Sequence, residues 1–261
     1  MSRITYLYPI QQRVSFTLIA KKHIRLLRDL GLEIREADIH SFKPEDLSKV
    51  TLVHPILYPL VSNPKTYRTL LRYSDKLIGF DVADTDKMSP LACYVLSQFD
   101  LVLVPSEYIK KVYFNSGVVT RVEVLPHGID DAYLRESREP KHPKLQEIAK
   151  LNGTKFLFFL WHSGYRKAAD IVAEAFANLV KQEPNVYLIV KMARNPDPFT
   201  QFLLTIDNVI IINEWLNEDD LVDLYDVCDV VLVPSRGGGF ELNALEALAP
   251  VSYTHLTLPT N

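Results

Sequence analysis

The sequence contains little cysteine and no excess of positive charge. Cys93 and Cys228 are the only cysteines among 261 residues, too few for a disulfide framework, which favours a reducing, cytoplasmic compartment. Lysine and arginine number 29 against 32 aspartate and glutamate residues, so the net charge is -3. A chain of this charge has no general attraction for nucleic acid, and no local basic patch is evident. We therefore expect no nucleic-acid partner.

Long hydrophobic runs are also missing. The longest, residues 156–161, is far shorter than the roughly 20 residues that cross a bilayer. Residues 1–22 lack the apolar core of a secretory signal peptide, because Pro9 and Arg13 interrupt it. Hydrophobic residues make up 48% and charged residues 23% of the chain, which is typical of a globular protein. These features predict a soluble protein of one large domain or two modest ones.

Short apolar runs alternate with amphipathic stretches along most of the chain. The runs occupy residues 4–8, 51–57, 76–80, 101–104, 156–161, 186–190, 209–212 and 230–233. Continuous rather than alternating apolar strands are typical of parallel sheets covered on both faces by helices. Apolar residues at helical spacing predict three of the covering helices, at residues 16–30, 171–180 and 221–228. The first should end at Gly31 and the third begin at Asn217, and the chain is predicted to be an α/β protein.

An internal repeat indicates two domains. Residues 100–106 (DLVLVPS) return almost unchanged as residues 229–235 (DVVLVPS), each predicting a buried strand that ends in Pro-Ser at a helix entrance. Residues 135–144 are charged and interrupted by proline, which favours a linker over the alternative of a long surface loop. We predict Rossmann-like domains at residues 1–134 and 153–250, joined by residues 135–152 and facing each other across a cleft.

The last eleven residues differ from the rest. Residues 251–261 (VSYTHLTLPTN) continue neither a helical nor a strand pattern, and they resemble a translated sequencing adapter. We interpret them as a non-native tail, and the carboxyl-terminal domain as incomplete.

The richest cluster of candidate functional residues is residues 234–249 (PSRGGGFELNALEALA). Three consecutive glycines, Gly237, Gly238 and Gly239, would let the backbone approach a ligand closely, and the start of a following helix suits a phosphate. Glu246, farther along that helix, could reach a ribose diol. Helix packing is the alternative role for the glycines.

A second cluster, residues 162–170 (HSGYRKAAD), follows a predicted strand. Arg166 and Lys167 sit at the start of the predicted helix, where the helix dipole disfavours cations. A bound anion would relieve that repulsion, and a solvated basic turn is the alternative.

Taken together, these motifs resemble the family 4 glycosyltransferases of the GT-B fold, over almost the whole of residues 4–249. In the amino-terminal half the matching segments are residues 100–108 (DLVLVPSEY), 117–118 (GV) and 124–130 (VLPHGID). In the carboxyl-terminal half they are residues 221–229 (LVDLYDVCD), 234–235 (PS), 239–240 (GF) and 245–249 (LEALA). The resemblance implies transfer of a sugar from a UDP- or GDP-type nucleotide diphosphate sugar with retention of configuration. It implies no cofactor, and a glycan, lipid-linked or small-molecule acceptor.

The resemblance also assigns site residues, with two departures. Of the two family glutamates separated by seven residues, the second matches Glu246, whereas the first falls on Gly238. Glu241 is close enough in sequence to substitute, although we expect its side chain to point elsewhere on the helix. The family lysine that neutralises the diphosphate matches Lys167.

The family arginine falls near His162, so Arg166 would carry its charge. On this interpretation Lys167, Arg166 and Glu241 are catalytic. The two cations would stabilise the charge that develops on the β-phosphate when the anomeric bond breaks, and Glu241 would substitute for the missing glutamate at the sugar. The remaining donor-binding residues are predicted to be Gly237, Gly238, Gly239, Phe240, Glu246, His162, Ser163 and Gly164.

The amino-terminal half offers further candidates that would line the cleft. Where the family has a glycine-rich loop, this chain has residues 9–13 (PIQQR), so Gln11, Gln12 and Arg13 are candidate ligand contacts. Asp84 and Asp86 form an acid pair after a strand; it could hold a metal, cap the strand or contact sugar or acceptor, and we predict no metal site. His127 either lines the cleft or is a hydrogen-bonded linker residue.

Two alternative functions stay open. Lys21, Lys22, Arg25 and Arg28 could place a helix on anionic lipid, but an ordinary solvated helix face explains them better. The missing first glutamate also fits a nucleotide-sugar-binding or regulatory protein without turnover, and the same fold includes epimerases and phosphorylases.

Overall fold

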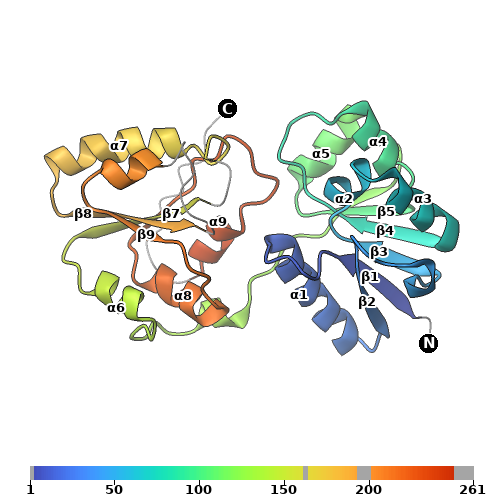
Figure 1. The fold of residues 1–261 in the computed structure, drawn as a ribbon, viewed down its shortest axis with the longest axis horizontal. Helices are drawn as coiled ribbons and strands as arrows, with labels where there is room; N and C mark the ends of the chain where they lie inside the picture. Colours follow the sequence, from blue (N-terminus) through green and yellow to red (C-terminus); the bar gives the residue numbers. More distant parts are fainter. Residues whose placement is uncertain (1–2, 161–163, 193–200, 250–261) are drawn as a thin grey trace. The chain divides into compact units, whose positions relative to one another are not determined.

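The computed structural model describes residues 3–160, 164–192 and 201–249, and the chain divides into two compact units, Met1–His127 and Gly128–Asn261 (Figure 1). Each unit is built on its own parallel sheet with helices on both faces. The predicted α/β class is confirmed. No helix in the described ranges is long and apolar enough to cross a membrane.

The sheet of the first unit has the strand order β2-β1-β3-β4-β5-β6. Its strands are β1 (Ile4–Tyr8), β2 (Ile34–Asp38), β3 (Val50–Val53), β4 (Lys76–Phe80), β5 (Leu101–Val104) and β6 (Val122–Val124). Its helices are α1 (Ser15–Asp29), α2 (Leu57–Val61), α3 (Pro64–Tyr73), α4 (Pro90–Leu96) and α5 (Glu107–Ser116), with a 3-10 turn η1 (Pro44–Asp46). Tyr6 and Tyr8 pack beside α1, whereas Leu7 between them belongs to the core under the other helices. Burial on both faces explains why the strands are continuously apolar.

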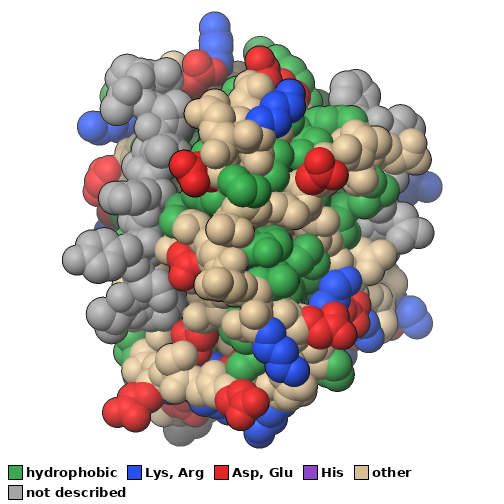
Figure 2. Space-filling model, turned by 90° about the vertical axis from the view of Figure 1, so that its left-hand side faces the viewer, with side chains coloured by type: hydrophobic (Ala, Val, Ile, Leu, Met, Phe, Trp, Pro, Cys, Tyr) green, Lys and Arg blue, Asp and Glu red, His purple; other side chains and the backbone are tan. Residues whose placement is uncertain are grey.

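The sheet of the second unit has the order β10-β7-β8-β9. Its strands are β7 (Thr154–Leu160), β8 (Val186–Met192), β9 (Val209–Ile212) and β10 (Val230–Leu232). Its helices are α6 (Pro143–Ala149), α7 (Ala169–Gln182), α8 (Glu218–Asp226) and α9 (Leu242–Ala247), with 3-10 turns η2 (Asp131–Leu134) and η3 (Gln201–Thr205). On the face of this unit seen in Figure 2, basic and acidic side chains are intermixed.

Most strand and helix predictions agree with the structure, and the disagreements have simple causes. The predicted strand at residues 51–57 stops at Val53, because His54-Pro55 turns the chain and α2 begins at Leu57. Gly31 has the predicted left-handed conformation (φ +83°), and the Asn217 side chain accepts a hydrogen bond from the Asp220 amide as a helix cap.

The repeated aspartates have the same role in both sheets. Asp100 accepts hydrogen bonds from the Leu77 amide of β4 (2.8 Å) and from Lys76 Nζ (2.7 Å). Asp229 accepts one from the Lys155 amide of β7 (2.7 Å). Each aspartate precedes a strand and binds the strand beside it, so the repeat in sequence is a repeat in strand pairing.

The structure differs from the predicted linker at residues 135–152. This segment belongs to the second unit, where Pro143 starts helix α6 and Leu145 and Ile148 are buried in the core. Proline is compatible with the first turn of a helix, so Pro143 starts α6 and does not mark an irregular linker.

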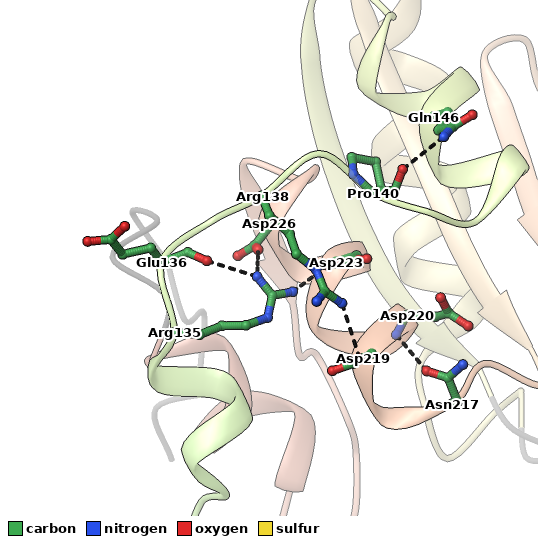
Figure 3. A network of polar contacts seen from close by, with 10 residues as sticks. All are labelled: Arg135, Glu136, Arg138, Pro140, Gln146, Asn217, Asp219, Asp220, Asp223 and Asp226. Carbon is green, nitrogen blue, oxygen red and sulfur yellow. Dashed lines mark hydrogen bonds and ion pairs between the residues drawn. The ribbon is translucent and has the colours of Figure 1, made fainter.

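The charges of this segment are paired with helix α8 (Figure 3). Asp223 is fully buried and accepts hydrogen bonds from Arg135 Nη2 and from Arg138 Nε, the latter at 3.1 Å. Arg135 Nη1 also reaches Asp226 (3.1 Å), and Arg138 reaches the exposed Asp219 (3.4 Å). Residues 135–138 are therefore fixed to α8 by two guanidinium groups that share one buried carboxylate.

Removing the shared charge should destabilise the second unit. In Asp223→Asn the two guanidinium groups lose their buried partner, so we expect the free energy of unfolding to fall by about 3 kcal/mol. Asp219→Asn changes an exposed partner of the same network and should cost less than about 0.5 kcal/mol. Urea unfolding of both variants measures the difference; equal effects would contradict a central role for Asp223.

Three histidines cluster in the first unit around Phe80. The His54 ring is buried and shares a 2.9 Å hydrogen bond between Nδ1 and the Phe80 carbonyl. His23 lies 6.1 Å from the His54 ring and 6.5 Å from the ring of His127, on which it stacks. Burial lowers the pKa of His54 to about 3 and the pKa values of His23 and His127 to about 4. The folded protein therefore holds these imidazoles neutral.

This cluster predicts acid sensitivity below pH 6.5. The unfolded chain binds a proton on each histidine near pH 6.5, whereas the folded chain does not, so stability is lost as the pH falls from 6.5 toward the folded pKa values. His54 alone should cost about 2 kcal/mol between pH 6.5 and 5.0. The pH dependence of the free energy of unfolding should flatten in His54→Asn but not in His40→Asn, which changes an exposed histidine. Equal pH dependence in wild type and His54→Asn would contradict the assignment.

Candidate functional site

Two turns meet at the carboxyl edge of the second sheet. The lysine turn (residues 164–168) follows β7, and the glycine turn (residues 234–241) follows β10. These strands are parallel neighbours, and the strand order reverses between them, because β8 and β9 extend from β7 on its other side. In open α/β sheets a ligand site typically forms at such a reversal, outside the carboxyl ends of the strands.

An ion pair connects the two turns. Lys167 Nζ lies 2.8 Å from Oε1 and 2.5 Å from Oε2 of Glu241, so it contacts both carboxylate oxygens. The two side chains are only 14% and 17% exposed. The predicted catalytic residues Lys167 and Glu241 are thus in direct contact, which their separation in sequence did not predict.

The Glu241 carboxylate occupies the space beside Gly238. A Cβ atom added to Gly238 would lie 2.3 Å from Glu241 Oε1, which is closer than Cβ atoms come to other heavy atoms in proteins. The expectation that the Glu241 side chain points elsewhere on a helix is wrong. Glu241 precedes α9, which begins at Leu242, so helical periodicity does not set its direction. Glycine at position 238 makes room for the carboxylate of residue 241.

The cations of the lysine turn lie outside helix α7. Arg166 Nη1 donates a hydrogen bond to the Gly237 carbonyl at 2.8 Å, across to the glycine turn. Ala168 adopts the left-handed conformation (φ +58°, ψ +39°), and α7 begins only at Ala169. The predicted placement of Arg166 and Lys167 inside a helix start is therefore corrected: a tight turn directs both side chains to the neighbouring loop.

Arg236 adds contacts that the sequence did not predict. Its guanidinium donates to both carboxylate oxygens of Asp170 at 2.7 Å and to the Tyr165 carbonyl at 2.7 Å. Its backbone amide donates to the Arg166 carbonyl at 2.8 Å. Arg236 lies in the predicted cluster at residues 234–249, and Asp170 lies in the one at residues 162–170. Their opposite charges were the sequence signal that could have indicated this contact.

Glu246 lies on α9 beside tyrosines. Its Oε2 accepts a hydrogen bond from the Tyr225 hydroxyl at 2.8 Å, and Tyr133 also hydrogen-bonds it. Burial, together with the charge of Glu246, raises the pKa of both tyrosines. The carboxylate is therefore held by neutral hydroxyl donors, which the sequence did not reveal.

The other predicted donor-site residues are placed as follows. Gly239 is buried and Phe240 half-buried, and the helix predicted to follow the glycines, α9, begins at Leu242. The Gly164 carbonyl accepts the Ala169 amide at 2.9 Å. His162 and Ser163 lie outside the described residues.

The candidates of the first unit lie on separate loops. Gln12 shares a 3.1 Å hydrogen bond with His40, and Gln11 and Arg13 are exposed beside it after β1. Asp84 and Asp86 are exposed on the loop after β4, and His127 belongs to the histidine cluster. Within the described ranges no group of three or more His, Cys, Asp or Glu residues could hold a metal ion.

Asp81, at the end of β4, was not predicted. It is buried and accepts hydrogen bonds from the amides of Ile56, Leu57 and Val82. Burial raises its pKa to about 7 despite these donors. We assign it to fixing the start of α2.

Comparison with known sequences identifies relatives. Residues 154–250 match the family described as "Glycosyl transferases group 1". The chain is 31% identical over 261 residues to "Uncharacterized protein 356" of Sulfolobus islandicus rod-shaped virus 1, covering 94% of this chain and 70% of that protein. It is 27% identical over 228 residues to "Putative glycosyltransferase 45" of a Sulfolobus islandicus filamentous virus, covering 85% of this chain and spanning only 60% of that protein's length.

Solved structures show the same fold. The structure described as "Trehalose-6-phosphate from E. coli bound with UDP-2-fluoro glucose" matches 98% of this chain and 84% of its own with a TM-score of 0.71 at 14% identity. Sucrose-phosphate synthase from Thermosynechococcus elongatus matches 98% and 81% with a TM-score of 0.70 at 14% identity. An Anabaena protein in complex with UDP and glucose matches 97% and 80% with a TM-score of 0.67 at 15% identity. The predicted GT-B fold is confirmed.

Replacing Gly238 by alanine should separate Lys167 from Glu241. The added methyl group needs the space of the carboxylate, whose side chain is flexible enough to move away, so we expect overall stability to change little. A double-mutant cycle with Lys167→Met and Glu241→Gln should give a coupling free energy of about 1 kcal/mol in the wild type and close to zero in Gly238→Ala. Gly128→Ala, where an added Cβ meets nothing within 4 Å, should keep the coupling. A full coupling in Gly238→Ala would show that the carboxylate does not depend on this glycine.

Proposed function

The chain belongs to the group 1 glycosyltransferase family, and from this premise we propose that it transfers a sugar from a nucleotide diphosphate sugar to an acceptor with retention of configuration. The observation that carries the proposal is the meeting of Lys167, Arg166 and Glu241 where the strand order reverses. Cations at this edge of a sheet suit a diphosphate, and a carboxylate beside them suits sugar hydroxyls.

We propose a UDP-sugar as the first donor to test, with a GDP-sugar as the alternative. Two of the structural neighbours are described as bound with UDP-2-fluoro glucose and in complex with UDP and glucose. These ligands belong to those proteins, and at 14% and 15% identity the likeness concerns the fold.

On this proposal Lys167 and Arg166 stabilise the leaving group. Cleavage of the anomeric bond puts negative charge on the β-phosphate while positive charge develops on the sugar. Fixed cations that face this charge in a partly buried site lower the barrier, by about 3 kcal/mol for one such donor. Lys167 is held in place by Glu241, and Arg166 by the Gly237 carbonyl, so both are oriented before the donor arrives. No enzyme nucleophile is required.

Glu241 takes the role of the carboxylate missing at position 238. Its oxygens lie where a side chain of residue 238 would begin, so the acid is supplied three residues later. When the diphosphate takes over Lys167, the Glu241 carboxylate becomes available to the hydroxyls of the donor sugar. Glu246, with Tyr225 and Tyr133 donating to it, binds the ribose hydroxyls in this scheme.

We place the acceptor at the carboxyl edge of the first sheet. Gln11, Gln12 and Arg13 follow β1, Asp84 and Asp86 follow β4, and His127 follows β6. These polar groups suit a hydroxyl-bearing acceptor of the glycan, lipid-linked or small-molecule class. A cytoplasmic location stays a prediction from the cysteine content.

Loss of the Glu246 charge should weaken donor binding. Wild-type protein should show a higher melting temperature in saturating UDP-glucose, because a ligand that binds only the folded state stabilises it. In Glu246→Gln the dissociation constant from calorimetry should rise about tenfold, since a charge-assisted hydrogen bond to ribose is replaced by a neutral one. Glu174→Gln, an exposed change on α7, is the matched control and should bind as the wild type does.

Three outcomes would contradict the proposal in different ways. Wild-type protein that binds neither UDP-glucose nor GDP-mannose is not a transferase for these donors. Unchanged affinity in Glu246→Gln removes the ribose role alone. Binding of the donor without hydrolysis or transfer would favour a binding or regulatory protein of the same fold.

A further inference from the structure

Arg236 links the glycine turn to the lysine turn and to the start of α7 through several contacts. From the glycine turn, its guanidinium holds the Tyr165 carbonyl and both oxygens of Asp170, each at 2.7 Å. Asp170 lies in the first turn of α7, immediately behind the lysine turn. Arg236 therefore contacts Tyr165 near the start of the lysine turn and Asp170 just after its end.

The orientation of this guanidinium is fixed by further contacts. Its Cζ lies 4.3 Å from the centre of the Tyr165 ring, a cation–π arrangement. The Arg236 amide donates to the Arg166 carbonyl, and Arg166 in return donates to the Gly237 carbonyl. The two turns are thus joined in both directions, through backbone and side-chain atoms, directly beside the Lys167–Glu241 pair.

Stability does not explain this arrangement. The Asp170 and Arg236 side chains are 52% and 30% exposed, and ion pairs with this exposure add little to the free energy of unfolding. What a two-oxygen Arg–Asp contact does supply is a defined geometry. Hydrogen bonds from Arg236 also lower the pKa of Asp170 to about 2, so its carboxylate is ionised at neutral pH.

Direct binding of the donor by Arg236 is the competing role. Its Nη1 atom already donates both of its N–H groups, one to Tyr165 and one to Asp170, and Nη2 donates to the second oxygen of Asp170. Most of the guanidinium is therefore committed to the lysine turn, which favours a structural link over a phosphate contact.

We propose that Arg236 is a positioning residue for donor binding, which sets the spacing between Lys167 and Glu241 through its two-oxygen contact with Asp170. The inference rests on the proposed function for its consequence, the affinity for a nucleotide diphosphate sugar. The claim that Arg236 sets the spacing between Lys167 and Glu241 is independent of that function.

A donor-free experiment tests the structural claim. The coupling between Lys167→Met and Glu241→Gln is measured by urea unfolding in the wild type and in Arg236→Ala. We expect the coupling free energy to fall by at least half in Arg236→Ala, with the melting temperature of Arg236→Ala itself within about 2 °C of the wild type. Undiminished coupling would overturn the inference and leave the proposed function untouched.

A binding experiment tests the consequence, with UDP-glucose as the probe and GDP-mannose in parallel. Arg236→Ala and Asp170→Asn should each raise the dissociation constant about tenfold, and Arg236→Lys, which keeps the charge but not the fork, should fall between them and the wild type. Asp219→Asn, which removes an exposed aspartate paired with Arg138 on α8, is the matched control and should bind within twofold of the wild type.

The charge-reversed pair separates positioning from direct contact. The double variant Arg236→Asp, Asp170→Arg keeps an Arg–Asp contact between the two positions with the charges exchanged. We therefore expect its affinity for UDP-glucose to recover to within about threefold of the wild type. If Arg236 contacted the diphosphate itself, the new aspartate would repel it, and the double variant would bind more weakly than either single variant. That result would overturn the inference. Failure of the wild type to bind either donor would overturn the proposed function and, with it, the binding consequence.

Discussion

The contact of Lys167 with Glu241 above Gly238 is the interaction on which the site depends. A half-buried lysine needs an anionic partner, and Glu241 supplies both of its oxygens. On the proposed function, an anionic donor would therefore replace a carboxylate at Lys167 instead of meeting a free cation. Such an exchange limits the desolvation that binding would otherwise require, because the lysine is already partly removed from water. It also releases the carboxylate beside the place where the donor sugar would lie.

The sheet makes this contact possible. β7 and β10 are parallel neighbours, so the turns that follow them start at the same edge, although they are far apart in sequence. The Asp229 side chain binds the first amide of β7 from the loop before β10, which fixes the two strands at their other end. Arg135 and Arg138, bound to Asp223, attach the preceding segment to α8, whose Tyr225 reaches Glu246. The Asp229 contact thus holds together the two strands whose turns carry Lys167 and Glu241, and Tyr225 connects Glu246 to helix α8.

The sequence predicted the layers of the fold better than the details of the site. Continuous apolar runs identified most strands because burial on both faces leaves no polar alternation, whereas β2 (IREAD) and β6 (VEV) carry charged residues and were missed. Gly31 and Asn217 marked helix ends because their conformational and capping preferences are local. The direction of Glu241, the contacts of Arg236 and the tyrosines at Glu246 depend on which strands are neighbours, and no local preference contains that information. The contacts of residues 135–138, in the segment predicted as a linker, are hidden from the sequence for the same reason, since Arg135 pairs with Asp223, 88 residues later.

A structure of the protein with UDP-glucose bound tests most directly whether the donor displaces Glu241 from Lys167. We expect the diphosphate within about 4 Å of Lys167 Nζ, in the place of a Glu241 oxygen, with the Glu241 carboxylate turned to the sugar and Glu246 on the ribose. A diphosphate bound away from the lysine and glycine turns, or a Lys167–Glu241 pair that stays intact with the donor elsewhere, would contradict this expectation.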